Sequence, residues 1–269
     1  ALPISEFWER FSYYGMRAIL IYYMYYEVSK GGLGLDQTMA TAIMSIYGSL
    51  VYMSGIIGGW LADRVLGPSR SVFYGGIFIM LGHVVLAFPG GATMLFTSMA
   101  LIVLGTGLLK PNVSTIVGEM YSEADARRDS GFSIFYMGIN LGGFIAPLIV
   151  GTVGTEYNFH LGFGLAAIGM LIGLIVFMIT RKRTLGLAGM IVPNPMDKDE
   201  RKKVIKLLSI GAIVVAILLA LSISLGWLTL ESFVLVVAVL GVLIPICYFV
   251  VMYRSPKTND VERSRLTAY

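Results

Sequence analysis

The segment EFWERFSYYG, residues 6–15, brings three charged side chains into the start of what is otherwise an apolar helix. Its continuation, residues 16–28, is rich in Ile, Leu, Met and Tyr, as a membrane span would be. An ionisable side chain in hydrocarbon costs roughly 2.5 to 3.5 kcal/mol even on the more lenient insertion scale. Glu6, Glu9 and Arg10 therefore need either buried partners or contact with water.

The composition of the whole chain indicates an all-α membrane protein. Of its 269 residues, 57% are hydrophobic and only 13% are charged, and the mean hydropathy is +0.79. A soluble domain of this size does not normally bury so much apolar surface. Since about 20 residues cross the hydrocarbon core, the uncharged runs and the opening segment together predict about eight helices. The runs are 37–62, 71–88, 94–109, 130–155, 157–180, 207–230 and 232–253.

The distribution of basic residues predicts how the chain crosses the membrane. Most of the 20 Lys and Arg residues lie in one set of alternate loops, whereas the opposite set contains only Lys30. The positive-inside rule then places the N terminus and the loop 181–203 in the cytoplasm, in a multi-pass protein of the cell membrane. The net charge of +4 follows from this topology and does not indicate nucleic acid as a partner. Binding of acidic lipids by residues 198–203 stays open.

Breaks in the apolar pattern divide the chain into four parts. Residues 1–183 are predicted to form an N-terminal six-helix bundle. Residues 184–203 are predicted to be a cytoplasmic linker, because prolines near its centre, Pro193 and Pro195, interrupt any helix. Residues 204–254 are predicted to form a transmembrane helical hairpin, and residues 255–269 a second basic linker.

Pairs of glycines four residues apart recur in the predicted helices. Small residues at this spacing let helix backbones approach closely in lipid, so the pattern favours helix packing, with a dimerisation face as the alternative. The pairs are Gly55 and Gly59, Gly138 and Gly142, and Gly169 and Gly173.

A charged stripe follows one face of the first helix. Glu6, Glu9, Arg10, Tyr13 and Arg17 recur at spacings that place them on the same side. The stripe has two acids and two bases, so it can be buried only against a partner or a water-filled cavity. The alternative is that Glu6 to Arg10 lie at the membrane interface and extend toward water.

Lys110 is the expected partner of this stripe. It is the only Lys, Arg, Asp or Glu between residues 71 and 118, within the segment GTGLLKPNV, residues 105–113. Pro111 follows it directly and is expected to bend the helix, to free a backbone carbonyl and to open space beside the lysine. Lys110 and Arg10 lie at comparable distances from the cytoplasmic ends of their segments and are expected to meet at one depth.

The remaining polar residues in the spans indicate packing more than chemistry. Asn140 is interpreted as either an interhelical hydrogen-bonding residue or a substrate ligand, and Tyr47 and Tyr52 as packing or interfacial residues. His83 and His160 lack neighbouring ligands, so no metal site is expected. A phosphate-binding loop, a catalytic triad and cysteine-rich zinc spacing are all absent from the sequence, which gives no support to an enzyme or an ATP-driven pump.

Three motifs resemble those of known transporters. The pattern ExxERFxYYG, residues 6–15, resembles the signature of the proton-dependent oligopeptide transporter (POT or PTR) family. FYMGINLG, residues 135–142, resembles that family's second signature on helix five. GWLADRVLGPSR, residues 59–70, resembles the loop between helices two and three of the major facilitator superfamily and indicates only the superfamily.

The resemblance implies a fold of two six-helix halves, with two extra helices between them in bacterial members. This chain would then be the N-terminal six-helix half of a major facilitator fold plus the inserted hairpin. Residues 255–269 would lead into a C-terminal six-helix half, which is the partner that completes the transport site.

The function implied is uptake of di- and tripeptides together with protons, by alternating access across the lipid bilayer and without a cofactor. Proton coupling is expected of Glu6, Glu9, Arg10 and Lys110, whose charges can exchange partners during the cycle. A proton-coupled carrier of nitrate or another small anion is the alternative within the family. A membrane scaffold or sensor that does not transport is the alternative outside it.

The two ends of a peptide predict how the same residues would bind it. Every peptide has a carboxylate, which we expect to bind Arg10 and Lys110 through charge-assisted hydrogen bonds. Tyr13, Tyr14 and Tyr52 would line the middle of the site, and Asn140 would bond the peptide backbone or amino end. Arg17 is expected to belong to the same substrate-binding face.

Overall fold

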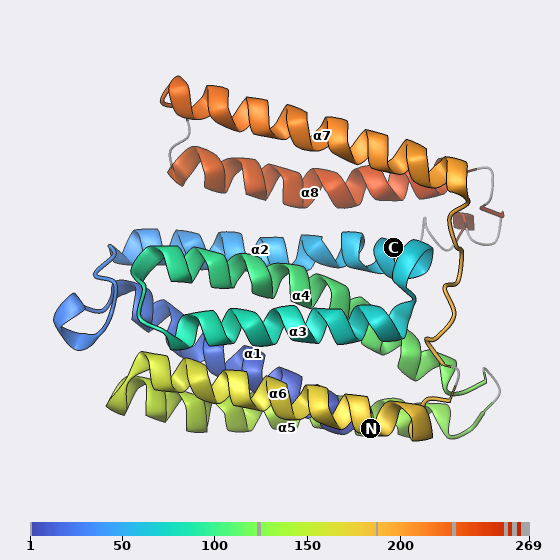
Figure 1. The fold of residues 1–269 in the computed structure, drawn as a ribbon, viewed down its shortest axis with the longest axis horizontal. Coiled ribbons are helices and arrows are strands. Elements are labelled where there is room, and N and C mark those ends of the chain that lie inside the picture. The colour runs from blue at the N-terminus through green and yellow to red at the C-terminus, as the bar shows by residue number, and fades with distance from the viewer. Residues whose placement is uncertain are drawn as a thin grey trace. The chain divides into compact units, whose positions relative to one another are not determined.

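All regular secondary structure in the described part of the chain is helical. The structure is a computed structural model and describes residues 2–122, 125–186, 188–227, 230–255, 258–259 and 263–264. Figure 1 shows long helices joined by short connections. The predicted all-α class is therefore confirmed.

Eight α-helices follow one another in the described part of the chain. They are α1 (Leu2–Tyr25), α2 (Gln37–Leu61), α3 (Pro68–Ala87), α4 (Gly91–Glu119), α5 (Arg128–Ala146), α6 (Phe159–Thr184), α7 (Lys198–Ser224) and α8 (Leu230–Arg254). Segments with wider π-type turns prolong α2 and α5: η2 (Ala62–Leu66), η3 (Pro147–Gly151) and η4 (Val153–Tyr157). A short 3-10 helix, η1 (Val28–Lys30), lies between α1 and α2.

Five described helical segments are long and apolar enough to cross a membrane. They are Gln37–Leu66, Pro68–Ala87, Gly91–Glu119, Arg128–Tyr157 and Phe159–Thr184. The fourth predicted span ends at residue 109, but α4 continues through Pro111 to Glu119. The helices α1, α7 and α8 have 24, 27 and 25 residues, so their length allows a crossing, and that they cross stays a prediction.

Local signals in the sequence set several helix ends. The Asp36 carboxylate accepts hydrogen bonds from the backbone N–H groups of Thr38 (2.8 Å) and Met39 (3.4 Å) and so caps α2. These bonds hold the pKa of Asp36 below its ordinary value, because they stabilise the ionised form. Gly67 adopts a φ of 79°, which favours glycine, and Pro68 then begins α3.

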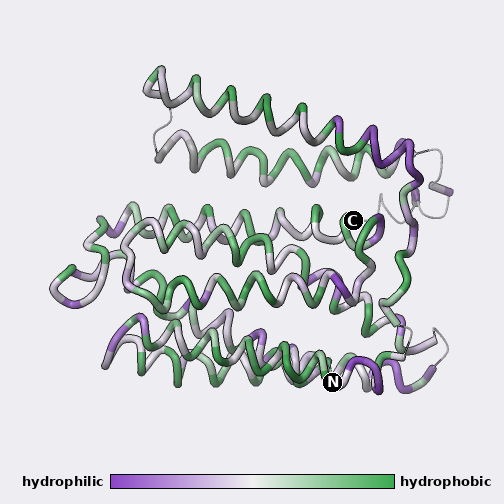
Figure 2. The backbone as a smooth tube through the Cα atoms, in the orientation of Figure 1, coloured by the Kyte–Doolittle hydropathy of each residue, from purple (hydrophilic) through white to green (hydrophobic). Residues whose placement is uncertain are grey.

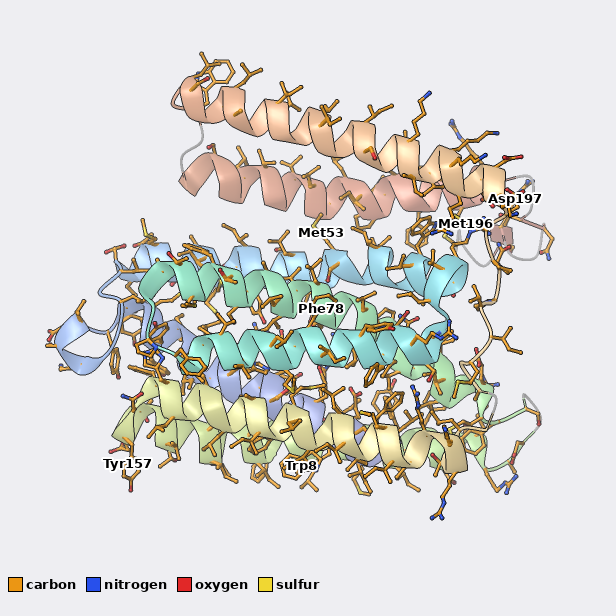
Figure 3. All side chains as sticks on the ribbon, in the orientation of Figure 1. Trp8, Met53, Phe78, Tyr157, Met196 and Asp197 are labelled. Carbon is orange, nitrogen blue, oxygen red and sulfur yellow. The ribbon has the colours of Figure 1, made fainter. Side chains whose placement is uncertain are left out.

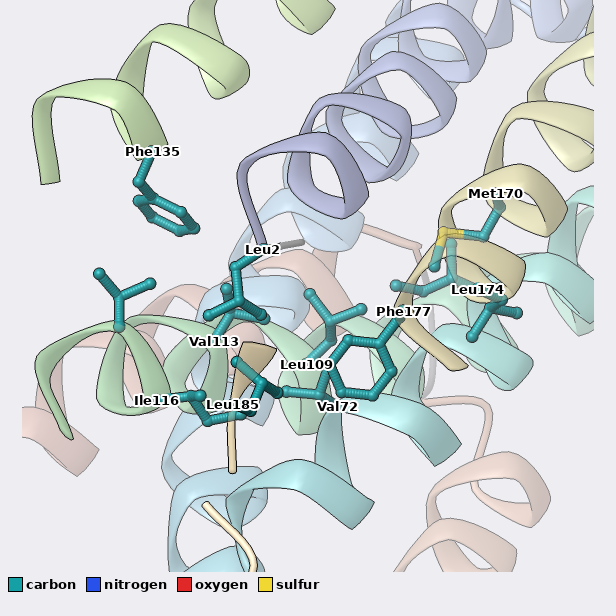
Figure 4. Packing of buried hydrophobic residues seen from close by; sticks show 12 residues of the cluster. Leu2, Val72, Leu109, Val113, Ile116, Phe135, Met170, Leu174, Phe177 and Leu185 are labelled. Atoms are coloured by element: carbon teal, nitrogen blue, oxygen red, sulfur yellow. The ribbon is translucent and has the colours of Figure 1, made fainter. Parts of the chain in front are cut away.

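Residues 1–212 form one compact unit, whose helices pack around α1 and α4. The helix α1 packs against α5 and α6, α4 packs against α2 and α3, and α3 also contacts α6. Figure 4 shows the core where side chains of α3, α4 and α6 meet Leu2 of α1. Trp8, labelled in Figure 3, lies where α1 meets α6, close to Gly169 and Gly173.

Two of the three predicted glycine pairs lie at helix contacts, and one does not. A Cβ atom at Gly142 would lie 2.4 Å from the Phe7 carbonyl oxygen of α1, and one at Gly138 would lie 2.5 Å from that of Pro3. A Cβ at Gly55, in contrast, would meet nothing within 4 Å. The closest contact of α2 is made by Gly58, and a Cβ at Gly59 would lie 4.0 Å from the Pro111 Cβ, so within the described chain the packing prediction was wrong for Gly55.

Most basic residues in the connections of this unit lie at one end of its helices, called the basic end below, whereas Lys30 lies in the connection between α1 and α2. It contains the start of α1, the turn between α2 and α3, and the end of α6 with Arg181, Lys182 and Arg183. Figure 2 shows hydrophilic residues, in purple, at this end, where α1 begins and α6 ends. The start of α1, at Leu2, therefore lies with the basic loops, and the side of the membrane that they face stays a prediction.

The predicted linker is bound to the basic end over much of its length. The Gly189 carbonyl accepts a hydrogen bond from Ser69 N at 2.8 Å, and Gly189 N donates to Glu119 Oε2 at 2.6 Å. Further along, Asn194 N donates to the Asp63 carbonyl at 2.9 Å. These contacts attach the linker to the turn between α2 and α3 and to the end of α4.

The helix α7 begins within the stretch predicted as linker. Asp197 Oδ1 accepts bonds from Asp199 N (2.9 Å) and Glu200 N (2.7 Å) and so caps a helix that starts at Lys198. Met196 and Asp197 are labelled at this point in Figure 3. Glu200 is also paired with Arg64. The predicted boundary at residue 204 therefore misses the first turns of α7.

Residues 213–269 form a second compact unit, which contains the end of α7 and the helix α8. Trp227 N donates to the Ser222 carbonyl at 2.9 Å, and Gly226 adopts a φ of 69°, so the chain turns where the hairpin was predicted to turn. The predicted second linker, residues 255–269, falls mostly outside the described residues.

Candidate functional site

The charged stripe of α1 is a buried ion cluster. The Arg10 guanidinium donates to both Glu9 carboxylate oxygens, with Nη2 to Oε1 at 2.7 Å, and Arg10 Nε lies 3.2 Å from Glu6 Oε1. Glu6, Glu9 and Arg10 are 6%, 2% and 4% exposed. These charges therefore do not extend into an aqueous interface, and the alternative of interfacial snorkelling was wrong for this structure.

Close contact with α5 holds this cluster in place. A Cβ atom at Gly142 would lie 3.2 Å from the Arg10 Cβ as well as 2.4 Å from the Phe7 carbonyl oxygen. Only glycine allows the two backbones this approach, which excludes lipid and solvent from that side of Arg10. The glycines of the segment FYMGINLG thus position α5 directly against the segment ExxER of α1.

Along the next turns of α1, the side chains of the stripe change from buried to exposed. The Arg10 guanidinium lies 5.4 Å from the centre of the Tyr13 ring, and Arg17 Nη1 donates to the Tyr13 hydroxyl at 3.4 Å. Tyr13 is 6% exposed, whereas Tyr14 is 37% exposed and Arg17 is also exposed. The stripe is therefore not uniform, because its first three charges are buried and its last one is not.

Lys110 and Tyr52 form a second group, between α4 and α2. Lys110 Nζ lies 4.6 Å from the centre of the Tyr52 ring, a distance at which the cation is attracted to the ring face. Both residues are exposed, Tyr52 by 70%. Lys110 makes no ion pair in the described part of the chain, although Glu6 lies within range of its charge.

The turn of α4 before Pro111 packs closely against α2. Proline has no N–H group, so the carbonyl of Gly107, four residues earlier, loses its helical donor. A Cβ atom at Gly58 would lie 1.9 Å from this carbonyl oxygen, which therefore packs directly against the Gly58 backbone. The carbonyl that Pro111 frees is therefore covered by α2, whereas Lys110 itself is exposed.

Two polar residues at this site were not predicted from the sequence. Asn112 is 2% exposed, and its Nδ2 donates to the Leu108 carbonyl at 2.7 Å and to the Gly58 carbonyl at 3.4 Å. The rule that singled out Asn140, an amide in an apolar run, would have found Asn112. Ser12 is fully buried, and its hydroxyl donates to the Glu9 carbonyl at 2.7 Å.

Asn140 lies apart from both groups. It is exposed on α5 and makes no hydrogen bond to a described residue. The structure thus brings together Glu6, Glu9 and Arg10 with Tyr13 and Arg17, and it pairs Lys110 with Tyr52, with the Lys110 charge in range of Glu6. The described residues also contain no cluster of three or more His, Cys, Asp or Glu that could bind a metal ion.

Comparison with known proteins places these features in one class, that of multi-pass membrane transporters. The family description "PTR2: POT family" matches residues 69–269, which is more than half of the chain. The chain therefore belongs to the POT family, a family of transporters and not of enzymes, as the motifs predicted. The match begins after the segment ExxER, so that segment supports the assignment independently.

Individual relatives agree with this assignment. The chain is 63% identical over 268 residues to the uncharacterized transporter YclF of Bacillus subtilis, covering 100% of this chain and 54% of that protein. It is 52% identical to the di-/tripeptide transporter of Lactococcus lactis, covering 98% of this chain and 54% of that protein. The chain thus spans about half the length of these relatives.

Solved structures show the same relation. The crystal structure of a peptide transporter POT in complex with sulfate matches with a TM-score of 0.91 and 70% identity, over 100% of this chain and 55% of that chain. A POT family transporter in complex with 5-aminolevulinic acid matches with a TM-score of 0.92 and 46% identity, over 99% and 55%. The helical bundle is therefore a transporter fold, and its length corresponds to about half of one.

Proposed function

We propose that this chain supplies the N-terminal half of a transporter that takes up di- and tripeptides together with protons across the cell membrane. The proposal rests mainly on one observation: Lys110 presents an ammonium group on an exposed face beside Tyr52 and has no carboxylate partner in the described chain. An unpaired cation of this kind suits the carboxylate that every peptide carries. The relatives named as di-/tripeptide transporters support the same substrate class.

Peptide binding would use the exposed parts of both groups. Lys110 would bind the peptide carboxylate, and Arg10 would join it after release from Glu6 and Glu9. Such charge-assisted hydrogen bonds contribute on the order of 1.5 to 3 kcal/mol each. Tyr13, Tyr14 and Tyr52 would contact the peptide side chains, because a phenol offers both an apolar face and a hydroxyl.

The other end of the peptide would meet residues outside the α1 cluster. Asn140 is exposed on α5 and has free hydrogen-bonding capacity toward a backbone or amino group. Arg17 lies on the exposed continuation of the stripe and would belong to the same face. A second six-helix half, opposite these exposed residues, would complete the site.

Proton coupling would depend on which partner Arg10 has. In this structure Arg10 is paired with both acids, so the peptide carboxylate competes with Glu6 and Glu9 for it. Protonation of a glutamate would weaken its hold on Arg10 and make the guanidinium available. Alternating access would follow if peptide and proton together favour a state in which the acids are neutral.

The orientation in the membrane forms part of the same proposal. The basic end would face the cytoplasm, and the N terminus with it, because basic loops are retained on that side. Peptide would enter from the opposite side and leave near the basic end.

Uptake by the full-length protein in proteoliposomes tests the function. A proton gradient, inside alkaline, should drive accumulation of a labelled dipeptide, and unlabelled dipeptide should compete whereas nitrate should not. Competition by nitrate alone would favour the small-anion carrier. Absence of any gradient-driven flux would favour the scaffold or sensor.

A further inference from the structure

A small cavity lies inside the bundle beside the carboxylates of α1. Its volume is about 20 Å³, and Ser5, Glu6 and Glu9 form its polar wall. The rest of its wall is apolar and belongs to the core cluster of α3, α4 and α6 that Figure 4 shows, including Val113 and Leu174. The cavity therefore joins an ion cluster to a hydrophobic core.

The position of this cavity differs from that of the proposed peptide site. Leu109 and Val113 of α4 line the cavity and are 3% and 4% exposed, whereas Lys110 is exposed on another face of the same helix. The cavity, with Glu6 and Glu9 in its wall, therefore lies on the buried side of α4. A group in the cavity would approach them from a different direction than a peptide bound at Lys110.

The size of the cavity restricts its occupant. A water molecule needs roughly 10 to 15 Å³ of such volume and two to four polar partners, whereas purely apolar cavities stay dry. A volume of about 20 Å³ admits one water molecule and excludes an amino acid or a peptide. The polar wall then decides whether that water is bound.

The polar wall has unused hydrogen-bonding capacity. The Ser5 hydroxyl is buried and has no partner among the described residues. The Glu6 carboxylate has Arg10 Nε at 3.2 Å and accepts no hydrogen bond from a described residue, whereas Glu9 accepts two from Arg10. An unsatisfied buried polar group costs about 1 to 3 kcal/mol, so one molecule that bonds the Ser5 hydroxyl would remove this cost and could also donate to Glu6.

We infer that this cavity binds a single water molecule. The water donates one hydrogen bond to Glu6 and forms a second hydrogen bond with the Ser5 hydroxyl. Under the proposed function, the water has a specific role. When Arg10 moves to the peptide carboxylate, the water keeps Glu6 hydrogen-bonded in place of its ion-pair partner. Arg10 can then change partners without leaving the Glu6 carboxylate buried and without a hydrogen bond.

Crystal structures of the full-length protein test the site directly. Wild type should show one solvent peak at hydrogen-bonding distance, about 3 Å, from both Ser5 Oγ and the Glu6 carboxylate. Val113→Ile adds a methylene group to the cavity wall and should remove this peak. Ser5→Ala, which removes only the hydroxyl group from the cavity wall, should reduce its occupancy. A well-ordered wild-type cavity without a peak would overturn the site, whether or not the protein transports peptides.

Transport by the same variants tests the role of the water. Val113→Ile should lower proton-driven accumulation of a dipeptide several-fold while counterflow exchange persists. Val117→Ile is the matched control, because it adds the same group to the same helix beside another cavity, of about 50 Å³, whose described lining has no carboxylate. Equal effects of the two variants on transport, or no effect of Val113→Ile, would overturn the role of the water in proton coupling. The solvent peak in the crystal structures would still decide whether the water is bound.

Discussion

The contact of α1 with α5 and the contact of α2 with α4 each include a basic side chain. The two side chains differ in burial and in their partners. At the first contact, Arg10 is buried and paired with two acids. At the second, Lys110 is exposed, lies over an aromatic ring and has no ion pair in the described chain. Arg10 must therefore leave its acidic partners before it can bind a ligand, whereas Lys110 is available to a ligand directly.

Truncation of the buried cation should have the largest effect on stability. Arg10→Ala leaves two carboxylates buried without their partner, and breaking a buried ion pair in this way costs about 3 to 5 kcal/mol. Lys110→Ala removes an exposed cation–π contact worth about 0.5 to 1 kcal/mol. Unfolding of the two variants in detergent should therefore differ by several degrees in Tm. Equal destabilisation would show that the two contacts do not differ as described.

Neutralisation of one acid should affect coupling more than stability. Glu9→Gln keeps the shape of the side chain and leaves Glu6 and Arg10 as a neutral pair, so the fold should survive. The variant cannot exchange a proton at this position, and gradient-driven accumulation of dipeptide should disappear while counterflow exchange continues. Accumulation against a gradient by Glu9→Gln would exclude Glu9 as a coupling residue.

Two glycines on α2 provide a matched test of the second contact. Gly58→Ala places a Cβ atom 1.9 Å from the Gly107 carbonyl oxygen and should destabilise the bundle by about 1 to 3 kcal/mol through overpacking. Gly55→Ala meets nothing within 4 Å and should be neutral or slightly stabilising, since alanine has the higher helix propensity. Thermal unfolding of both variants measures this difference, and a harmless Gly58→Ala would contradict the close approach of α2 and α4.

An exposed ion pair should give the smallest effect. In the connection between α4 and α5, the Arg127 guanidinium donates to Asp125 at 2.9 Å and lowers the pKa of that carboxyl. Because the folded-state pKa is depressed, any stabilisation is present above the ordinary pKa near 3.9 and is lost as the pH falls below it. Arg127→Ala should raise the Asp125 pKa toward that value in an NMR titration and leave Tm at pH 7 unchanged. A clear loss of Tm would show that exposed pairs also support this fold.

Much of the α1 contact could be predicted from the sequence because it depends on helical periodicity. Residues three, four and seven apart share a face, so Glu6, Glu9, Arg10 and Tyr13 had to meet, and the glycine pair at Gly138 and Gly142 indicated where another helix approaches. The outcome for Arg17 could not be predicted in the same way. Its exposure depends on where the neighbouring helices diverge, which is a property of the packed bundle.

The α2–α4 contact was harder to predict, since it depends on how two backbones fit. Pro111 suggested a bend and a gap, but the carbonyl it frees belongs to Gly107, and another glycine, Gly58, packs against it. Which of the glycines on α2 faces α4 depends on the rotation of that helix. The start of α7 differs from the prediction because Pro193 and Pro195 favoured a linker up to residue 203, whereas Asp197 caps a helix that begins at Lys198.

The most direct test of the account compares a dipeptide with its C-terminal amide. The amide lacks the anionic carboxylate, so wild-type full-length protein should bind the dipeptide about ten- to a hundredfold more tightly, as one charge-assisted hydrogen bond allows. Lys110→Ala should lose most of this preference, and Arg10→Ala should do so to the extent that it folds. Tyr52→Phe, which keeps the ring under Lys110, should retain it. The same preference in Lys110→Ala as in wild type would contradict the claim that the unpaired cation of α4 binds the peptide carboxylate.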